Sequence, residues 1–527
     1  MQKIISLKLL PSEAADPERV QQCIAQAEGI KDNSVSGFLV LKHSIDARGR
    51  QPWISLSLKA YINEPFQPRE LMQFRFRDIS AAPGKVLIIG AGPAGLFAAL
   101  QLIEKGIRPI ILERGKDVRT RRRDLADLNK EGEVNPESNY CFGEGGAGTY
   151  SDGKLYTRSS KRGDINRILN LFVHFGAEEK ILYEAHPHIG TNKLPQIITA
   201  MRKKIMDCGG LFLFEKKVVD LVLSNQEIKE VRTADGDLFE ADAVILATGH
   251  SARDIFELLH NKKILVESKS FALGIRVEHP QSLIDSVQYH LPKTAVKSGS
   301  LRPAELPPAA YSWVQQVEGK GVFSFCMCPG GIIAPAATSP GELVVNGWSP
   351  SKRNNPYANS GIVVSVEEKD LQGFKKYGPL AGMFFQRSVE KKAFDAGGGK
   401  FVAPAQRLVD FATGTISSSL PACSYLPGIR ATSLKEVLPG FIHRSLQQAF
   451  KEYGKKMKGY FTNEAIVVAT ESRTSSPVRI PRDSTSLEHP QIKNLYPCGE
   501  GAGYAGGIVS AAMDGERVAA MIVLKVL

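Results

Sequence analysis

The chain lacks long apolar stretches and clustered cysteines, and both absences narrow what it can be. No apolar run approaches the roughly 20 residues that cross a membrane, so we predict no membrane-spanning helix. The segment from Met1 to Leu7 is too short in its apolar part for a signal peptide. The seven cysteines are scattered and include no Cys-x-x-Cys pair, so neither a zinc ribbon nor a disulfide-reductase dithiol is expected. We predict free thiols, a reducing cytoplasm and no metal site.

Composition and charge set few other limits. Hydrophobic residues make up 43% of the 527-residue chain and charged residues 23%, which are ordinary globular values. This length predicts two to four domains. The net charge of +12 makes nucleic acid a candidate partner. Residues 116–123 form the densest cluster of basic side chains. No aromatic residues are interleaved with it as in a base-stacking platform. Nucleic acid is therefore an unfavoured partner that composition does not exclude, and neutralisation of a pyrophosphate and a solvated helix face are the other roles for the cluster.

A glycine-rich turn follows the apolar residues 86–89 and precedes a helical pattern over residues 93–105. Glycines at this spacing permit a tight turn, let the backbone approach a pyrophosphate, and let helix and strand pack closely. The free N–H groups at the start of the helix favour the phosphates. We expect a dinucleotide to be held by Gly90, Gly92, Pro93, Ala94 and Gly95.

An acidic residue stands at the end of the next predicted strand, residues 107–112. Glu113 lies near the spacing of about 20 residues at which a carboxylate hydrogen-bonds an adenosine ribose 2′-hydroxyl. That hydroxyl is phosphorylated in NADP, so Glu113 argues against NADP at this site. We place Arg114 in the same site.

A second glycine-rich turn, residues 498–507, precedes the apolar residues 508–513. One such turn at the head of a nucleotide fold and another at its tail is the layout of an FAD-binding protein. The carboxylate of Glu500 is placed to accept a hydrogen bond from a ribityl hydroxyl, and the helix that follows can stabilise an anionic reduced flavin. The residues predicted to contact FAD here are Gly499, Glu500, Gly506, Gly507 and Ile508.

Residues 142–155 contain five glycines, which indicates a backbone that approaches a ligand. A loop without a ligand role is the alternative. We expect Lys154 to hold charge near the flavin. Further along the chain, the apolar residues 243–247 end in a Thr-Gly turn that should return to the nucleotide. The predicted FAD contacts in these segments are Gly145, Gly146, Gly148, Thr149, Ser151, Val219, Thr248 and Gly249.

The order of these patterns predicts an α/β chain of three parts. Residues 1–78 read as a small β-α-β-β module of the ferredoxin-like or a similar kind. Residues 83–265 and 461–527 would form a Rossmann-like FAD-binding domain split in sequence. Residues 266–460 would form an inserted mixed α+β substrate domain. No second strand, glycine turn and helix unit follows, so NADH or NADPH would act as a transient donor without a dedicated domain.

Four residues are candidates for catalysis beyond the flavin. Cys328 precedes Pro-Gly-Gly and would act as a proton donor or nucleophile if its pKa were lowered; the alternative is that it is a small buried hydrophobe on a strand. Glu471 and Arg473 would pair and bind an anionic substrate, or form a structural ion pair. Lys154 is the fourth candidate, and we expect His250 to be structural.

Five segments together resemble a known group of bacterial proteins: GEGGAGTYSDGKL, ATGHSARD, CMCPGG, TESRTSSPVRI and CGEGAGYAGGI. The chain resembles the uncharacterised FAD-dependent dehydrogenases (predicted NAD/FAD-utilising dehydrogenases) along nearly its whole length. The resemblance implies bound FAD on a glutathione-reductase-like fold, with an unknown small organic substrate. Glu500 stands where many related flavoproteins carry Asp. An FAD-dependent oxidoreductase is thus expected, with an RNA-modifying or RNA-binding flavoprotein and a non-catalytic FAD scaffold as alternatives.

Overall fold

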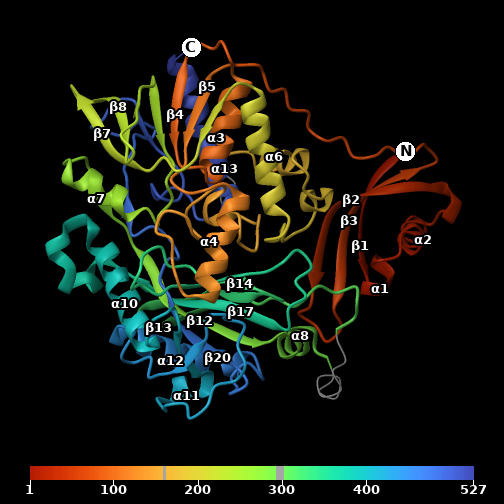
Figure 1. Cartoon of the computed structure of the whole chain (residues 1–527). Coiled ribbons are helices and arrows are strands. Elements are labelled where there is room, and N and C mark those ends of the chain that lie inside the picture. The colour runs from red at the N-terminus through yellow and green to blue at the C-terminus, as the bar shows by residue number, and fades with distance from the viewer. Residues whose placement is uncertain (158–161, 292–301, 527) are drawn as a thin grey trace.

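The structure is a computed structural model that describes residues 1–157, 162–291 and 302–526. It contains a small N-terminal sheet, a parallel sheet with helices, and a larger, mostly antiparallel sheet (Figure 1). No helix in these ranges is long and apolar enough to cross a membrane.

The N-terminal sheet has the strand order β1-β3-β2, with β3 antiparallel to both neighbours. Strands β1 and β2 are therefore parallel to each other and are connected through a helix, which is the split β-α-β arrangement of ferredoxin-like folds. Val20, Ile24 and Ala25 of helix α2 are buried, so this helix packs one apolar face against the core. The elements are β1 Gln2–Leu9, α1 Pro11–Ala14, α2 Pro17–Glu28, η1 Asp32–Ser34, β2 Val35–Asp46 and β3 Trp53–Ile62.

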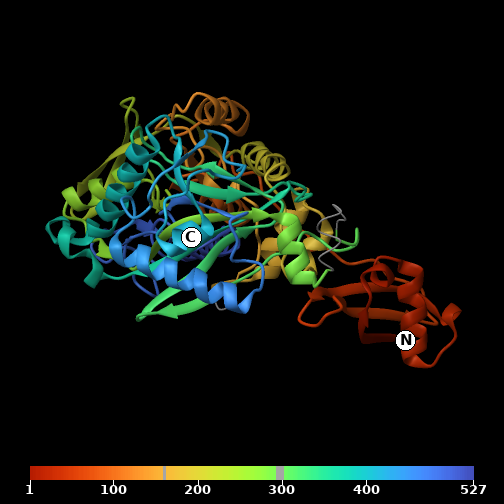
Figure 2. The same cartoon turned by 90° about the horizontal axis from the view of Figure 1, so that it is seen from below.

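An extended segment, residues 63–78, joins this module to the rest of the chain. Along it, Arg69 forms an ion pair with Glu179 at 2.8 Å, and the ring of Phe74 packs edge-on against His174. Two perpendicular views place the N-terminal module at one side of the molecule, apart from the other two sheets (Figures 1 and 2).

The parallel sheet has the strand order β22-β10-β4-β5-β6. Residues 86–89 of its central strand are buried, as expected for a strand that is covered on both faces. Helices α3, α5, α6 and α13 cover one face, and the sheet β7-β8-β9 with helix α7 covers the other. Helices α3 and α13 lie side by side although they come from distant parts of the chain (Figure 1).

The following elements form this part of the fold: β4 Lys85–Ile89, α3 Pro93–Glu104, β5 Arg108–Leu112, α4 Val118–Lys130, η2 Gly146–Gly148, α5 Ile165–His174, η4 Glu179–Leu182, α6 Leu194–Asp207, β6 Leu211–Leu213, β7 Val218–Ser224, β8 Glu227–Thr233, β9 Leu238–Phe239, β10 Ala243–Leu246, α7 Arg253–Asn261, β22 Leu495–Pro497 and α13 Ile508–Val526.

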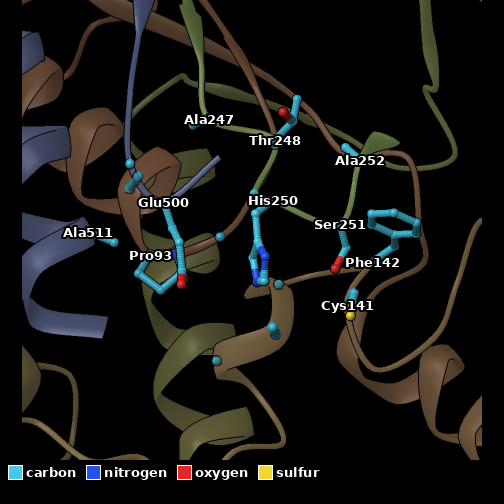
Figure 3. A pocket seen from close by; sticks show the side chains of 18 of the residues that line it. Pro93, Cys141, Phe142, Ala247, Thr248, His250, Ser251, Ala252, Glu500 and Ala511 are labelled. Carbon is cyan, nitrogen blue, oxygen red and sulfur yellow. The ribbon is translucent and has the colours of Figure 1, made fainter. Parts of the chain in front are cut away.

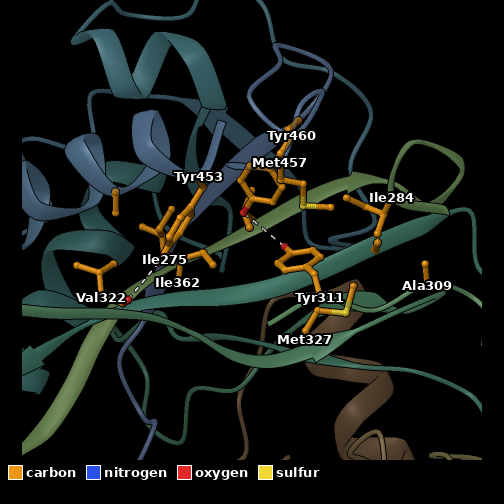
Figure 4. Close-up of a cluster of buried hydrophobic side chains, with 14 of the residues drawn as sticks. Ile275, Ile284, Ala309, Tyr311, Val322, Met327, Ile362, Tyr453, Met457 and Tyr460 are labelled. Carbon is orange, nitrogen blue, oxygen red and sulfur yellow. Dashed lines mark hydrogen bonds between the residues drawn. The ribbon is translucent and has the colours of Figure 1, made fainter. Parts of the chain in front are cut away.

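The third part is a seven-stranded sheet with the order β13-β14-β17-β12-β20-β18-β19. Strand β12 lies near its centre and pairs antiparallel with β17 and with β20. Strand β20 belongs to this sheet although it follows residue 460, where we expected the inserted domain to end. Helix α12 packs on the sheet through a cluster of buried rings, in which the Tyr453 hydroxyl donates a hydrogen bond to the Val322 carbonyl at 3.1 Å (Figure 4).

The remaining elements are β11 Glu267–Ser268, β12 Phe271–Pro280, α8 Gln281–Tyr289, β13 Val314–Val317, β14 Lys320–Cys328, β15 Ile332–Pro335, β16 Val345–Trp348, β17 Tyr357–Val366, η5 Glu368–Leu380, α10 Ala381–Gly397, β18 Ala403–Arg407, α11 Leu408–Thr413, β19 Ile429–Ala431, α12 Gly440–Lys456, β20 Ile466–Glu471 and β21 Val478–Arg479.

Candidate functional site

A cavity of about 390 Å³ lies between the carboxyl ends of the parallel strands and the seven-stranded sheet (Figure 3 shows part of its wall). This is the edge of a parallel sheet at which open α/β folds bind their ligands. Most of the residues predicted to bind a nucleotide line it: Gly90, Gly92, Pro93, Ala94, Glu113, Arg114, Gly146, Gly148, Ser151, Thr248, Gly249, Gly499, Glu500, Gly506, Gly507 and Ile508.

The glycines of the first turn serve different purposes. A Cβ on Gly92 would meet no atom within 4 Å, so this residue leaves open space in the cavity wall. A Cβ on Gly95 would lie 2.1 Å from the carbonyl oxygen of Gly90, so Gly95 does not line the cavity and instead lets helix α3 pack against the turn. Gly90 has a φ of 106°, and a Cβ there would lie 2.5 Å from the Ala247 carbonyl oxygen. The turn thus combines close packing with one open position.

Two helices begin at this cavity. Helix α3 starts at Pro93 without a side-chain cap, and helix α13 starts at Ile508 after Gly506 and Gly507, whose added Cβ atoms would also meet nothing within 4 Å. The first N–H groups of a helix have no partner within the helix, and its N-terminus carries partial positive charge. The cavity therefore offers two positions that favour negative charge.

The Glu113 side chain is 5% exposed and lies beside the first glycine turn, where its carboxylate connects three loops by hydrogen bonds. It accepts hydrogen bonds from the backbone N–H groups of Ala91, Gly115 and Gly143, each at 2.9 Å. A carboxylate has about four acceptor positions, so capacity for one hydroxyl donor remains. Its expected contact with a ribose stays a prediction.

Arg114 also lines the cavity, and its charge is already compensated. It pairs with Glu137 at 2.6 Å and with Asp254 at 2.9 Å, and its guanidinium lies 4.1 Å from the centre of the Phe142 ring. These contacts hold the guanidinium plane in one orientation at the cavity wall.

Glu500 and His250 extend into the cavity beside Pro93 (Figure 3). Burial raises the pKa of Glu500 to about 7, although the charge of Lys269 opposes the shift. Burial lowers the pKa of His250 to about 3, with further lowering by Arg473 and Arg253, so the imidazole is neutral at pH 7. Our expectation of a structural His250 missed that its ring faces the cavity.

Three more residues predicted to contact the cofactor do not line the cavity. Thr149 is fully buried and donates a hydrogen bond to the Glu144 carbonyl at 2.6 Å. Gly145 has no side chain because a Cβ would lie 2.1 Å from the Thr149 hydroxyl. Val218, rather than Val219, lines the cavity; because side chains alternate along a strand, Val219 points away and is 40% exposed.

The basic cluster of residues 116–123 lies outside the cavity wall. Much of it forms helix α4, where Arg121 is fully buried and donates to the carbonyls of Asn139 at 2.7 Å and Glu144 at 2.9 Å. Lys116 pairs with Asp124 at 2.8 Å. The expectation that the cluster neutralises a pyrophosphate is not supported by this geometry.

The expected pair of Glu471 and Arg473 does not form, because each side chain has other partners in the described structure. Glu471 is buried behind the cavity and accepts from Arg276 Nε at 2.7 Å. Burial raises the pKa of Glu471 to about 7 against the opposing charge of Arg276. Arg473 lines the cavity and pairs with Glu390 at 3.1 Å and Glu342 at 3.2 Å.

Lys154 crosses the cavity wall to strand β14. Its Nζ lies 3.8 Å from the sulfur atoms of both Cys326 and Cys328, and it donates a hydrogen bond to the Met327 carbonyl. Cys326 lines the cavity, whereas Cys328, our sequence candidate, is fully buried. Alternation along the strand could not distinguish these two cysteines, because residues two apart point to the same face of a sheet. The pairing of β14 is irregular between Phe325 and Cys328, and only Cys326 is accessible from the cavity.

The residues that line the cavity fit FAD. Gly92, Gly506 and Gly507 leave open space beside the protein backbone, so a phosphate of the ligand can approach the backbone there. The two helix N-termini suit a pyrophosphate and an electron-rich ring edge, and Glu113 and Glu500 supply hydroxyl acceptors at separate points of the wall.

Comparison with known families divides the chain much as the three sheets do. Residues 84–268 match the family model of pyridine nucleotide-disulphide oxidoreductases, and residues 270–474 match that of the FAD-dependent protein, C-terminal domain-like. Residues 1–61 match a domain of unknown function, DUF8436.

An uncharacterized protein of Clostridium beijerinckii is 37% identical over 527 residues, which covers 96% of each chain. Among solved structures, 2,6-dihydroxypyridine-3-hydroxylase from Arthrobacter nicotinovorans is 11% identical over 84% of both chains, with a TM-score of 0.36. CtdE in complex with FAD is 10% identical over 84% of this chain and 83% of that chain, with a TM-score of 0.32. Scores this low carry no argument about substrate. The cofactor of the chain is FAD, and the chain belongs to an uncharacterised family of FAD-dependent oxidoreductases.

Proposed function

We propose that the chain oxidises or reduces a small organic molecule that binds between its FAD and the seven-stranded sheet. One observation supports this proposal above the others: a single cavity is walled on one side by the glycine turns and on the other by Phe325, Cys326 and Arg473. A substrate in that space would contact both the cofactor and side chains that belong to another sheet.

FAD supplies two-electron transfer when it is bound, and the residues of the chain orient it and control protons. The N–H groups at the start of α3 and the carboxylates of Glu113 and Glu500 hold the cofactor in one orientation. Glu500 has a pKa near 7, so it can exchange a proton at the cavity wall in neutral solution.

Lys154 supplies a cation on the side of the cavity next to the seven-stranded sheet, whereas the charge of Arg473, on the same side, is compensated by Glu390 and Glu342. Burial alone would lower the pKa of Lys154, but the attraction of Cys326, Cys328 and Asp152 outweighs it and the net pKa is raised. A cation that stays charged at neutral pH favours a substrate or transition state with developing negative charge.

NADH or NADPH serves as a transient electron donor that enters the same cavity.

The seven cysteines are free thiols, which fits a reducing compartment such as the cytoplasm.

The test is anaerobic mixing of the FAD-loaded protein with NADH and, separately, with NADPH, while the flavin absorbance is followed. Bleaching faster than that of free FAD under the same conditions is the expected result. Retention of FAD with bleaching no faster than that of free FAD would favour a non-catalytic scaffold. A protein that cannot take up FAD would overturn the assignment of the cavity. Binding of RNA that weakens steeply with added salt would instead support an RNA-directed flavoprotein.

A further inference from the structure

Strand β14 presents two cysteines to one lysine at the edge of the FAD cavity. The Lys154 ammonium lies 3.8 Å from each sulfur, and its other neighbours are the Met327 carbonyl and Asp152 Oδ2 at 3.6 Å. Two sulfurs that share one cation at this distance lie on the same side of the strand.

The backbone at Cys326 is bent in a way that brings the two cysteines together. Cys326 has a φ of 47°, in the left-handed region that non-glycine residues seldom occupy, and the pairing of β14 with β17 is irregular between Phe325 and Cys328. The Cys328 thiol donates to the Cys326 carbonyl at 3.2 Å. Residues two apart in a strand are separated by about 6.6 Å, within the range of about 4.4–6.8 Å that disulfides span.

The two sulfurs differ in charge and in access. The neighbouring Cys328 side chain lowers the pKa of Cys326 well below its usual value, and the charges of Lys154 and Arg276 add to this effect, against burial. The Cys326 side chain, together with burial, raises the pKa of Cys328. Cys326, which faces the cavity, therefore has the lower pKa of the two thiols, and Cys328 lies buried behind it.

We propose that Cys326 and Cys328 are a second redox centre, a dithiol–disulfide pair that exchanges two electrons with FAD. In the oxidising direction, the Cys326 thiolate and the Cys328 thiol lose two electrons and the Cys328 proton, and an S–S bond forms between them. The two electrons and the proton are accepted by oxidised FAD. The reverse transfer breaks the S–S bond and restores the thiolate and the thiol.

This inference rests on the proposed function for its electron acceptor, but its residues are distinct from those that match known redox families. Both cysteines lie outside residues 84–268, which match the pyridine nucleotide-disulphide oxidoreductases. The pair would let the protein store two electrons beyond those held by FAD.

The first experiment does not depend on FAD. The protein is treated with diamide, alkylated under denaturing conditions, digested, and analysed by mass spectrometry. We expect an internal Cys326–Cys328 disulfide that dithiothreitol reverses, and its loss in Cys326→Ser and in Cys328→Ser. Cys141 also lines the cavity, so Cys141→Ser is the matched control and should keep the disulfide. Alkylation of both Cys326 and Cys328 after diamide treatment would overturn the proposal.

The second experiment counts electrons. The diamide-oxidised, FAD-loaded protein is freed of oxidant and titrated anaerobically with dithionite. We expect four electrons per FAD in the wild type and in Cys141→Ser, against two in Cys326→Ser. Two electrons per FAD in the wild type would contradict exchange with FAD while leaving the proposed function intact. A protein that forms the disulfide but takes up no FAD would refute the proposed function and the electron exchange together.

Discussion

Gly92 and Gly95 test the first turn of the cavity, because the same change to alanine should fail for different reasons at the two positions. A Cβ on Gly92 meets no protein atom within 4 Å, and its φ of −75° suits alanine. Loss of glycine at the helix N-cap costs about 0.5–1 kcal/mol, whereas restriction of the unfolded chain contributes about 0.4–1 kcal/mol in the opposite direction. The FAD-free Gly92→Ala protein should therefore melt close to the wild type.

The added methyl group of Gly92→Ala would stand where a pyrophosphate approaches the backbone. We expect FAD affinity to fall by about 10- to 100-fold, which corresponds to about 1.4–2.8 kcal/mol. In Gly95→Ala, the Cβ would lie 2.1 Å from the Gly90 carbonyl oxygen and 3.1 Å from Ile88 Cγ2, so backbone must move. Overpacking of this kind costs about 1–3 kcal/mol, which lowers the melting temperature of the FAD-free protein by about 2–12 °C.

The assay combines thermal melting of the FAD-free proteins with equilibrium FAD titration. Gly49→Ala is the control, because Gly49 also has open space around its Cβ but does not line the cavity. It should match the wild type in both measurements. Wild-type FAD affinity in Gly92→Ala would refute the placement of the pyrophosphate at this turn, and wild-type melting of Gly95→Ala would refute its packing role.

Three further predictions concern charged groups. The pKa of Glu500 is raised to about 7, and its ionised form is the stronger hydrogen-bond acceptor. FAD affinity should therefore rise between about pH 6 and pH 8 in the wild type and stay constant in Glu500→Gln. Equal pH profiles of the two proteins in FAD titrations would contradict this role. Glu471→Gln leaves the buried Arg276 without its carboxylate and should destabilise the protein by about 3–5 kcal/mol, and an unchanged denaturation midpoint would show that the pair is dispensable. Lys154→Met removes the cation beside Cys326, so the pKa of Cys326 rises and its alkylation by iodoacetamide slows at neutral pH, as mapped by peptide mass spectrometry against pH; an unaltered rate profile would exclude that influence.

Local patterns predicted the strand, turn and helix that line one half of the cavity, because these elements are neighbours in sequence. Helix α3 occupies Pro93–Glu104, within one residue of the range 93–105 that its helical pattern predicted, and residues 86–89 form the central buried strand. The fold class and the FAD cofactor were confirmed for the same reason: each glycine turn carries its own structural context.

The far wall of the cavity could not be predicted, because it depends on pairing between distant strands. Glu471 accepts a hydrogen bond from Arg276 because β20 lies beside β12 in the sheet. No spacing between residues in the sequence indicates that these two strands are neighbours. The sequence likewise singled out Cys328 but not Cys326, because the proximity of both cysteines to Lys154 arises from a bulge and from the return of a distant loop.

The split of the nucleotide-binding sheet also has a consequence for protein synthesis. Strand β22 and helix α13 follow the entire seven-stranded sheet in the chain, yet they complete the edge beside β10 and the layer beside α3. While the chain emerges from the ribosome, β10 therefore presents an unpaired edge and α3 an uncovered apolar side until this last segment is made. FAD can be enclosed only after translation has passed Gly507, and the intermediate before that point is the form most exposed to aggregation.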